Sequence, residues 1–184
     1  LKKVPFQITS FNSKFIVAFT EEFQLFELDF VSHSDIRLKN IATMLTQGST
    51  SCISNDDEFV AVCDELQSLV LYYYDDVSNK FSEHARNCID FGLSICRVSI
   101  DDYFCVDHEG NFFQMQISDS KNIESSDLEI HSCCALGESA SAMLVFCSPE
   151  EDSEEKQTKV LIGTQSSQYI EVISFKPSEE FVAL

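Results

Sequence analysis

A short apolar run that recurs at a fixed interval decides the fold: Phe15–Phe19 (FIVAF), Phe59–Cys63 (FVAVC) and Tyr103–Val106 (YFCV). The first residues of these runs lie 44 residues apart in both intervals. A fourth run, Val160–Gly163, starts 57 residues after Tyr103, and leaving out the acidic stretch 149–159 restores an interval of about 46. A fixed interval of this length indicates a repeated structural unit.

Each apolar run is followed by a polar break and then by a second strand-like run. These second runs are Phe23–Leu28, Leu69–Tyr74, Phe112–Ile117 and Tyr169–Ile173. Alternation of apolar and polar residues in the first, third and fourth predicts half-buried strands joined by hairpins. Gly110 and Asn111 supply residues that tolerate positive φ, as a tight hairpin requires. Short apolar segments before and after each pair bring the unit to about four strands.

Four-stranded units of this length are typical of β-propeller blades. We therefore predict an all-β fold of about four blades, covering residues 5–47, 48–91, 92–137 and 138–177. A blade has two apolar faces, which neighbouring sheets must cover, so these blades are expected to belong to a larger propeller or to pack against further chain. A β-sandwich is the alternative.

Composition limits the classes of function. Among 184 residues, 44% are apolar, which is enough for one domain with a buried core. Twelve basic and 31 acidic residues give a net charge of −19, which disfavours direct nucleic-acid binding. No apolar run reaches 18 residues, and no signal peptide is recognisable, so we expect no membrane partner. The acidic stretch 149–159 is predicted to be a disordered surface loop, with contact to a basic partner as the alternative.

The eight cysteines do not predict disulfides or a metal site. They include no C-x-x-C pair, and Cys63, Cys105 and Cys147 lie inside apolar runs. Such cysteines behave as small core residues, which favours reduced thiols in an intracellular protein. The four histidines have no zinc-ligand spacing to these cysteines. We expect no metal and no cofactor.

No catalytic residue is predicted. The sequence has no phosphate-binding glycine loop, nucleophile elbow, zinc-protease or EF-hand pattern. The pairs Asp56–Asp57 and Asp101–Asp102 recur near equivalent repeat positions, which indicates turn residues. Residues 107–109 (Asp-His-Glu) lie in a predicted hairpin, where consecutive side chains point in different directions.

The run Tyr72–Tyr74 permits two interpretations. Alternation along a strand sends Tyr73 to the face opposite Tyr72 and Tyr74. The tyrosines then either pack in the core with their hydroxyls at its rim, or form an aromatic anchor in a protein–protein groove.

Several short motifs, in order and with the right spacing, resemble one known family. They are Phe11–Phe15 (FNSKF), Leu69–Tyr74 (LVLYYY), residues 83–87 (EHARN), Ile100–Phe104 (IDDYF) with residues 107–113 (DHEGNFF), and Lys159–Thr164 (KVLIGT). The chain is similar over nearly all of residues 5–184 to the family of the large damaged-DNA-binding subunit. That family comprises the adaptor of cullin-4-type ubiquitin ligases, the largest cleavage and polyadenylation specificity factor subunit and a splicing factor 3b subunit.

The resemblance implies the last four blades of a C-terminal propeller that is seven-bladed in that family, ending where a helical segment starts at 178–184. In the ligase adaptors, two propellers form a cleft that docks a helix of exchangeable substrate receptors. Arg86 matches the arginine of the family motif E-x-A-R-D and becomes the first candidate for partner binding, with Tyr72, Tyr73 and Phe91 as aromatic neighbours.

The chain also departs from the family. The proline and tryptophan that follow the motif arginine are missing, and Gly92 stands at the tryptophan position. Residues 106–111 (VDHEGN) lack the Lys-Phe pair of the RNA-processing members, which favours the adaptor branch. The divergence suggests a specialised paralogue that serves DNA repair or chromatin silencing.

The prediction from sequence is a non-catalytic scaffold of a cullin-type ubiquitin ligase. It is expected in the nucleus, with the cytoplasm left open, and it binds protein partners and the rest of its own propeller. A scaffold in a polyadenylation or splicing complex is the alternative. An unrelated propeller enzyme is disfavoured because no blade carries a convergent polar cluster.

Overall fold

The computed structural model describes residues 3–32, 35–55, 58–64, 68–88, 92–98, 102–118, 126–148, 157–166 and 169–173. Across these residues the regular structure consists of β-strands, arranged in four antiparallel sheets. The predicted all-β, propeller-type fold is confirmed. The described part of the chain contains no helix that is long and apolar enough to cross a membrane.

Strands that are consecutive in sequence pair within each sheet. Sheet 1 contains β1 (Gln7–Phe11), β2 (Lys14–Phe19), β3 (Glu22–Ser32) and β4 (Asp35–Leu45). Sheet 2 contains β5 (Thr50–Asn55), β6 (Phe59–Asp64), β7 (Ser68–Asp75) and β8 (Lys80–Asn87). Sheet 3 contains β9 (Gly92–Arg97), β10 (Asp102–Asp107), β11 (Asn111–Ile117) and β12 (Leu128–Ala135). Sheet 4 contains β13 (Ala140–Ser148), β14 (Gln157–Thr164) and β15 (Tyr169–Ile173).

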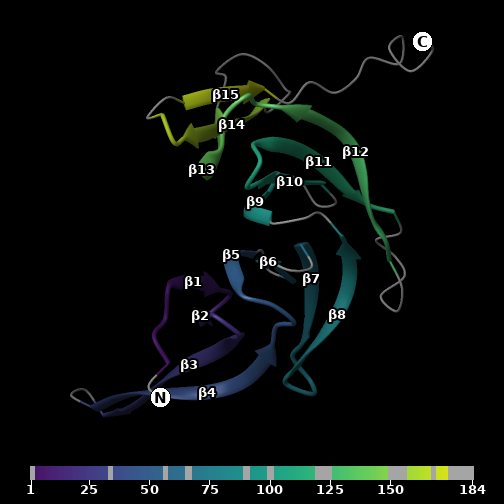
Figure 1. Cartoon of the computed structure of the whole chain (residues 1–184). Helices are drawn as coiled ribbons and strands as arrows, with labels where there is room; N and C mark the ends of the chain where they lie inside the picture. The colour runs from purple at the N-terminus through teal and green to yellow at the C-terminus, as the bar shows by residue number, and fades with distance from the viewer. Residues whose placement is uncertain are drawn as a thin grey trace.

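The four sheets follow one another along an arc, with β5 and β9 toward its inner side and β4, β8 and β12 along its outer side (Figure 1). This succession of small sheets is not the two-sheet layering of a β-sandwich. The arc is open, as expected for part of a propeller.

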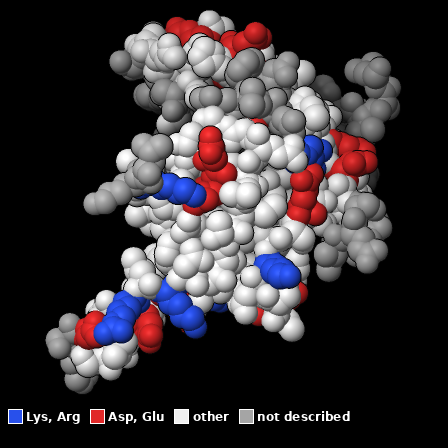
Figure 2. Space-filling model, turned by 60° about the horizontal axis from the view of Figure 1, so that its bottom comes forward, with Lys and Arg blue, Asp and Glu red and all other residues white. Residues whose placement is uncertain are grey.

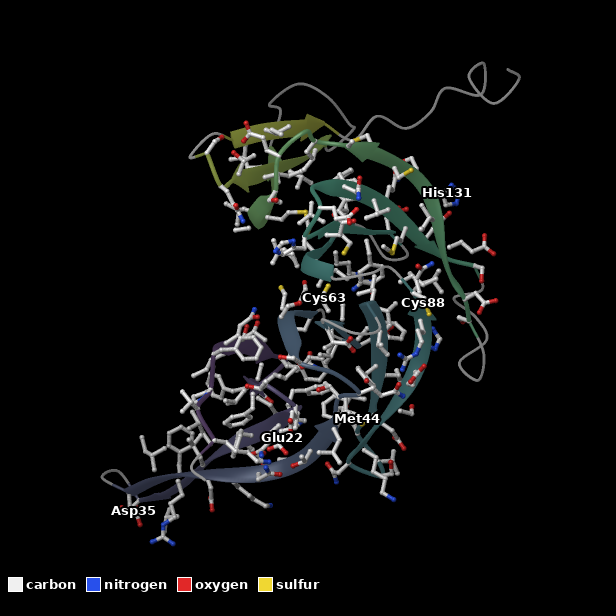
Figure 3. All side chains as sticks on the ribbon, viewed as in Figure 1. Glu22, Asp35, Met44, Cys63, Cys88 and His131 are labelled. Atoms are coloured by element: carbon white, nitrogen blue, oxygen red, sulfur yellow. The ribbon has the colours of Figure 1, made fainter. Side chains whose placement is uncertain are left out.

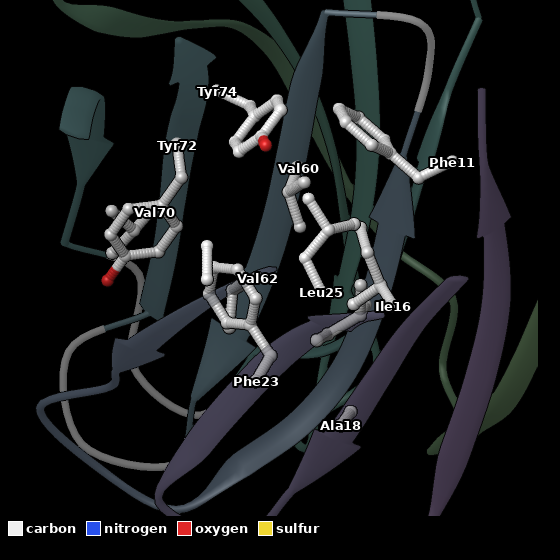
Figure 4. Packing of buried hydrophobic residues seen from close by; sticks show 12 residues of the cluster. Phe11, Ile16, Ala18, Phe23, Leu25, Val60, Val62, Val70, Tyr72 and Tyr74 are labelled. Atoms are coloured by element: carbon white, nitrogen blue, oxygen red, sulfur yellow. The ribbon is translucent and has the colours of Figure 1, made fainter. Parts of the chain in front are cut away.

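Apolar side chains alternate between the two faces of each sheet, so every interface between sheets has its own core. Val60 and Val62 of β6 pack toward sheet 1, whereas Ala61 and Cys63 pack toward sheet 3. Figure 4 shows the first of these cores, where side chains of sheets 1 and 2 interlock. A third core joins sheet 3 to sheet 4. Cys63 and Cys105 are both fully buried, which confirms their prediction as core residues.

Sheets 1 to 3 share a local irregularity in the pairing of their strands. The pairing of the third and fourth strands shifts register at Leu25/Phe26, Leu71/Tyr72 and Gln114/Met115, which are equivalent positions of sheets 1 to 3. The residues bypassed on the outer strands are Ile41, His84 and His131. A β-bulge of this kind reverses which face the following side chains occupy. In each of these outer strands, the alternation of side chains between the two faces is therefore shifted by one residue after the bulge.

Some predicted boundaries change. The acidic stretch was expected to run over 149–159, but Gln157–Lys159 already belong to β14 and pair with Ser148, Cys147 and Phe146. Residues 149–156 lie outside the described residues, as do Asp56, Asp57, Asp101 and the predicted helical segment 178–184. Of Gly110 and Asn111, only Gly110 has a positive φ, of 84°, while Asn111 begins β11.

Candidate protein-binding site

The candidate site is built on β8, the outer strand of sheet 2, around Arg86. Its Nε donates to Oε1 of Glu83 and its Nη2 donates to Oε2, both at 2.8 Å. Residues three apart in a regular strand point to opposite faces, so this contact needs an interruption between them. The bulge at His84 supplies it, because Tyr72 pairs with Glu83 while Leu71 pairs with Ala85. Arg86 and Glu83 thus reach the same face of the sheet.

Electrostatics of the pair follow from this geometry. The hydrogen bonds from Arg86 lower the pKa of Glu83, and the same bonds raise the pKa of Arg86. The Arg86 side chain is 20% exposed and that of Glu83 is 41% exposed. A partly exposed bidentate pair of this kind stabilises a fold by at most about 1 kcal/mol. Its larger effect is to fix the direction of the guanidinium and to leave the carboxylate as the more accessible partner.

Tyr72 is the cross-strand partner of Glu83 and is nearly inaccessible, with 2% of its surface exposed. Its ring packs edge-on against Phe23 of sheet 1, with centroids 5.3 Å apart (Figure 4). Burial, followed by the nearby charge of Glu83, raises the pKa of Tyr72 to about 12. The core-packing interpretation therefore describes Tyr72 correctly.

Tyr73 points to the other face of sheet 2. Its ring lies 5.9 Å from that of Phe59, its cross-strand partner, and Phe59 in turn lies 4.8 Å from the ring of His84. The structure therefore groups Arg86 with Tyr72 and places Tyr73 elsewhere. Phe91, the fourth predicted site residue, lies outside the described residues. A role of these residues in partner binding stays a prediction.

Sequence reasoning missed Glu83 as a site residue. Glu83 was part of the quoted motif, but three-residue spacing in a strand argues against contact with Arg86. No sequence signal indicates the contact, because it depends on the bulge, which the structure shows at the same repeat position in sheets 1 to 3.

The hairpin at 107–111 has a structural role. The Asp107 carboxylate accepts hydrogen bonds from the backbone N–H of Asn111 at 2.8 Å and from its Nδ2 at 2.7 Å. His108 and Glu109 are exposed, while Asp107 is buried. This geometry is that of a turn closed by an aspartate. Among the described residues, no group of three or more His, Cys, Asp or Glu side chains could hold a metal ion.

Two comparisons with known proteins bear on the chain. The family model described as the CPSF A subunit region matches residues 1–184. Among curated proteins, none matches the chain significantly.

Proposed function

The chain belongs to the family of the CPSF A subunit region, and we propose that it is a non-catalytic scaffold of a cullin-type ubiquitin ligase that docks substrate receptors. The family is one of propeller-type scaffolds, which supports a role in holding protein partners. We further propose that the protein acts in the nucleus, in DNA repair or chromatin silencing.

The observation that carries the docking proposal is the Arg86–Glu83 pair. It presents an oriented guanidinium and a more exposed carboxylate on an outer strand, next to the strand that carries the buried Tyr72. A bidentate arginine–carboxylate pair is a directional recognition element, unlike a freely rotating lysine. The net charge of −19 favours a basic receptor segment, which can approach through Glu83.

The experiment is a titration of the full-length protein with its purified receptor. We expect Arg86→Glu to weaken receptor affinity about tenfold, or about 1.4 kcal/mol, because two carboxylates would replace the oriented pair. Lys80→Glu is the matched control, since it makes the same charge change at an exposed position of the same strand. If Arg86→Glu binds the receptor like the wild type, Arg86 is not part of the site. If Arg86→Glu and Lys80→Glu lose the same affinity, the loss is only a general charge effect.

A second candidate is a scaffold in a polyadenylation or splicing complex. The family match supports this candidate and the ligase adaptor alike. The absence of the Lys-Phe pair from residues 106–111 favours the ligase adaptor instead. The partners recovered with the protein distinguish the two.

A further inference from the structure

The hairpin of β3 and β4 is longer than its counterparts and projects from sheet 1 (Figure 1). Both strands have 11 residues, whereas β7 and β8 have eight each. The shared bulge aligns Leu28 with Tyr74, the second-last residue of β7. Residues beyond Asp29 therefore have no strand counterpart in sheet 2. We call the paired segments 27–32 and 35–40 the arm.

One face of the arm is apolar. Leu28 pairs with Leu38, and Phe30 pairs with Ile36, so these four side chains share a face. Phe30 is 68% exposed, Leu38 is 64% exposed and Ile36 is 57% exposed. Exposed apolar side chains that lie next to one another, rather than singly, mark a contact surface.

The other face of the arm is charged out to its end. Glu27 pairs with Lys39 and Asp29 pairs with Arg37 across the strands, and Arg37 also binds Asp35 at 2.7 Å. Figure 2 shows the basic and acidic side chains together on the projecting arm, and Figure 3 labels Asp35 near its end. The arm is an amphipathic two-stranded ribbon, a structure that is marginally stable unless its apolar face is packed.

A neighbouring blade of the propeller would cover only the part of the apolar face formed by Leu28 and Leu38. Tyr74 and Phe81, the counterparts of Leu28 and Leu38, are packed by sheet 1 through contacts to Phe11 and Phe23. A preceding blade of ordinary length would pack Leu28 and Leu38 in the same way. Phe30 aligns with Asp76 of the β7–β8 turn, whose side chain stays 72% exposed although Lys14 Nζ of sheet 1 reaches it at 3.5 Å. The outer part of the apolar face stays available in a closed ring.

The net charge of the chain indicates which kind of partner binds the apolar face of the arm. An amphipathic ribbon could lie on a membrane with its charged face in water, but anionic lipid headgroups repel a chain with a net charge of −19, which disfavours a membrane. A second copy would bring together two chains that each carry a charge of −19. We propose that the apolar face of the arm binds an apolar segment of another protein that is flanked by lysine or arginine residues. This contact goes beyond the docking at Arg86 and does not depend on it.

The first experiment places a photo-crosslinking amino acid, p-benzoylphenylalanine, at position 36 of the full-length protein in its own cells. Position 39, on the charged face, is the control site. A crosslinked peptide that is apolar and flanked by basic residues, captured from position 36 but not from position 39, supports the proposal. Crosslinks to a second copy, to lipid or to an apolar peptide without basic flanks would overturn it, as would equal capture from both positions.

The second experiment titrates the full-length protein with a synthetic peptide of the captured sequence. Phe30→Asp and Ile36→Asp are expected to weaken binding at least tenfold, and replacing the basic flanks of the peptide by glutamate is expected to do the same. Val77→Asp, at a turn residue that is 93% exposed, is the matched control and should bind like the wild type. Arg86→Glu should bind this peptide like the wild type. A failure of the arm proposal can therefore be distinguished from a failure of receptor docking at Arg86. Unchanged binding of Ile36→Asp would overturn the proposal.

Discussion

Gly110 lies against the backbone carbonyl of Glu138 so closely that a Cβ at position 110 would be 2.2 Å from that oxygen. The carbonyl of Gly110 also accepts a hydrogen bond from the N–H of Leu136 at 2.8 Å. The turn between β10 and β11 is thereby fastened to the connection from sheet 3 to sheet 4. The hairpin of residues 107–111 thus contacts the segment that leads from sheet 3 into sheet 4.

Gly110→Ala is expected to destabilise the protein more than Gly137→Ala. Both glycines have a positive φ, of 84° and 80°, which costs an alanine about 1–2 kcal/mol. A Cβ at Gly137 meets nothing within 4 Å, so only Gly110→Ala adds a collision with backbone. Chemical denaturation of the two variants measures the difference. Equal losses of stability would mean that the connection at Glu138 moves aside freely.

Tyr72→Ala is expected to destabilise the fold by about 3–5 kcal/mol, the range for large aromatic side chains removed from a core. The change removes the contact with Phe23 and leaves a cavity between sheets 1 and 2. Val77→Ala, at a residue that is 93% exposed, should change the stability by less than about 0.5 kcal/mol. A thermal or denaturant transition that barely moves for Tyr72→Ala would contradict the packing described for this residue.

The pH dependence of stability is expected to include a contribution from Glu22. Glu22 is 4% exposed, and its carboxylate accepts hydrogen bonds from Lys3 Nζ and Gln24 Nε2. The bond to Lys3 is the main cause of a lowered pKa. A lowered pKa in the folded state gives stability that is present above the ordinary glutamate value of about 4.3 and is lost as the pH falls through the folded value.

The measurement is the melting temperature of wild type and Glu22→Gln between neutral and acidic pH. The wild type should be the more stable protein above about pH 5, and the difference should shrink as the pH falls below about 4. Glu21→Gln, which removes the same charge at an exposed neighbour, is the control. If both variants follow the same curve, net charge rather than the Lys3 bond is responsible.

Regular repetition explains why much of the fold could be predicted. The runs Phe15–Phe19, Phe59–Cys63 and Tyr103–Val106 lie in β2, β6 and β10. Alternating packing onto two neighbouring sheets makes both faces of β6 and β10 apolar. The second runs were also located, but β3 continues past Leu28 to Ser32. Its extension pairs only with β4, and the sequence repeat alone does not predict this longer pairing.

The site was harder to predict because it depends on one register shift. Strand alternation correctly separated Tyr73 from Tyr72, but it could not say which of them is buried, since that depends on Phe23 of the neighbouring sheet. The Arg86–Glu83 contact arises from the bulge at His84, and bulges are set by pairing across strands rather than by residue type alone.

The most direct test of the central claim is affinity purification of the full-length protein from its own cells, followed by identification of its partners by mass spectrometry. A ligase scaffold predicts recovery of a cullin together with several receptor-like proteins, and reduced recovery of the receptors, but not of the cullin, with Arg86→Glu. Recovery of polyadenylation or splicing subunits in place of a cullin would contradict the account and assign the protein to an RNA-processing complex.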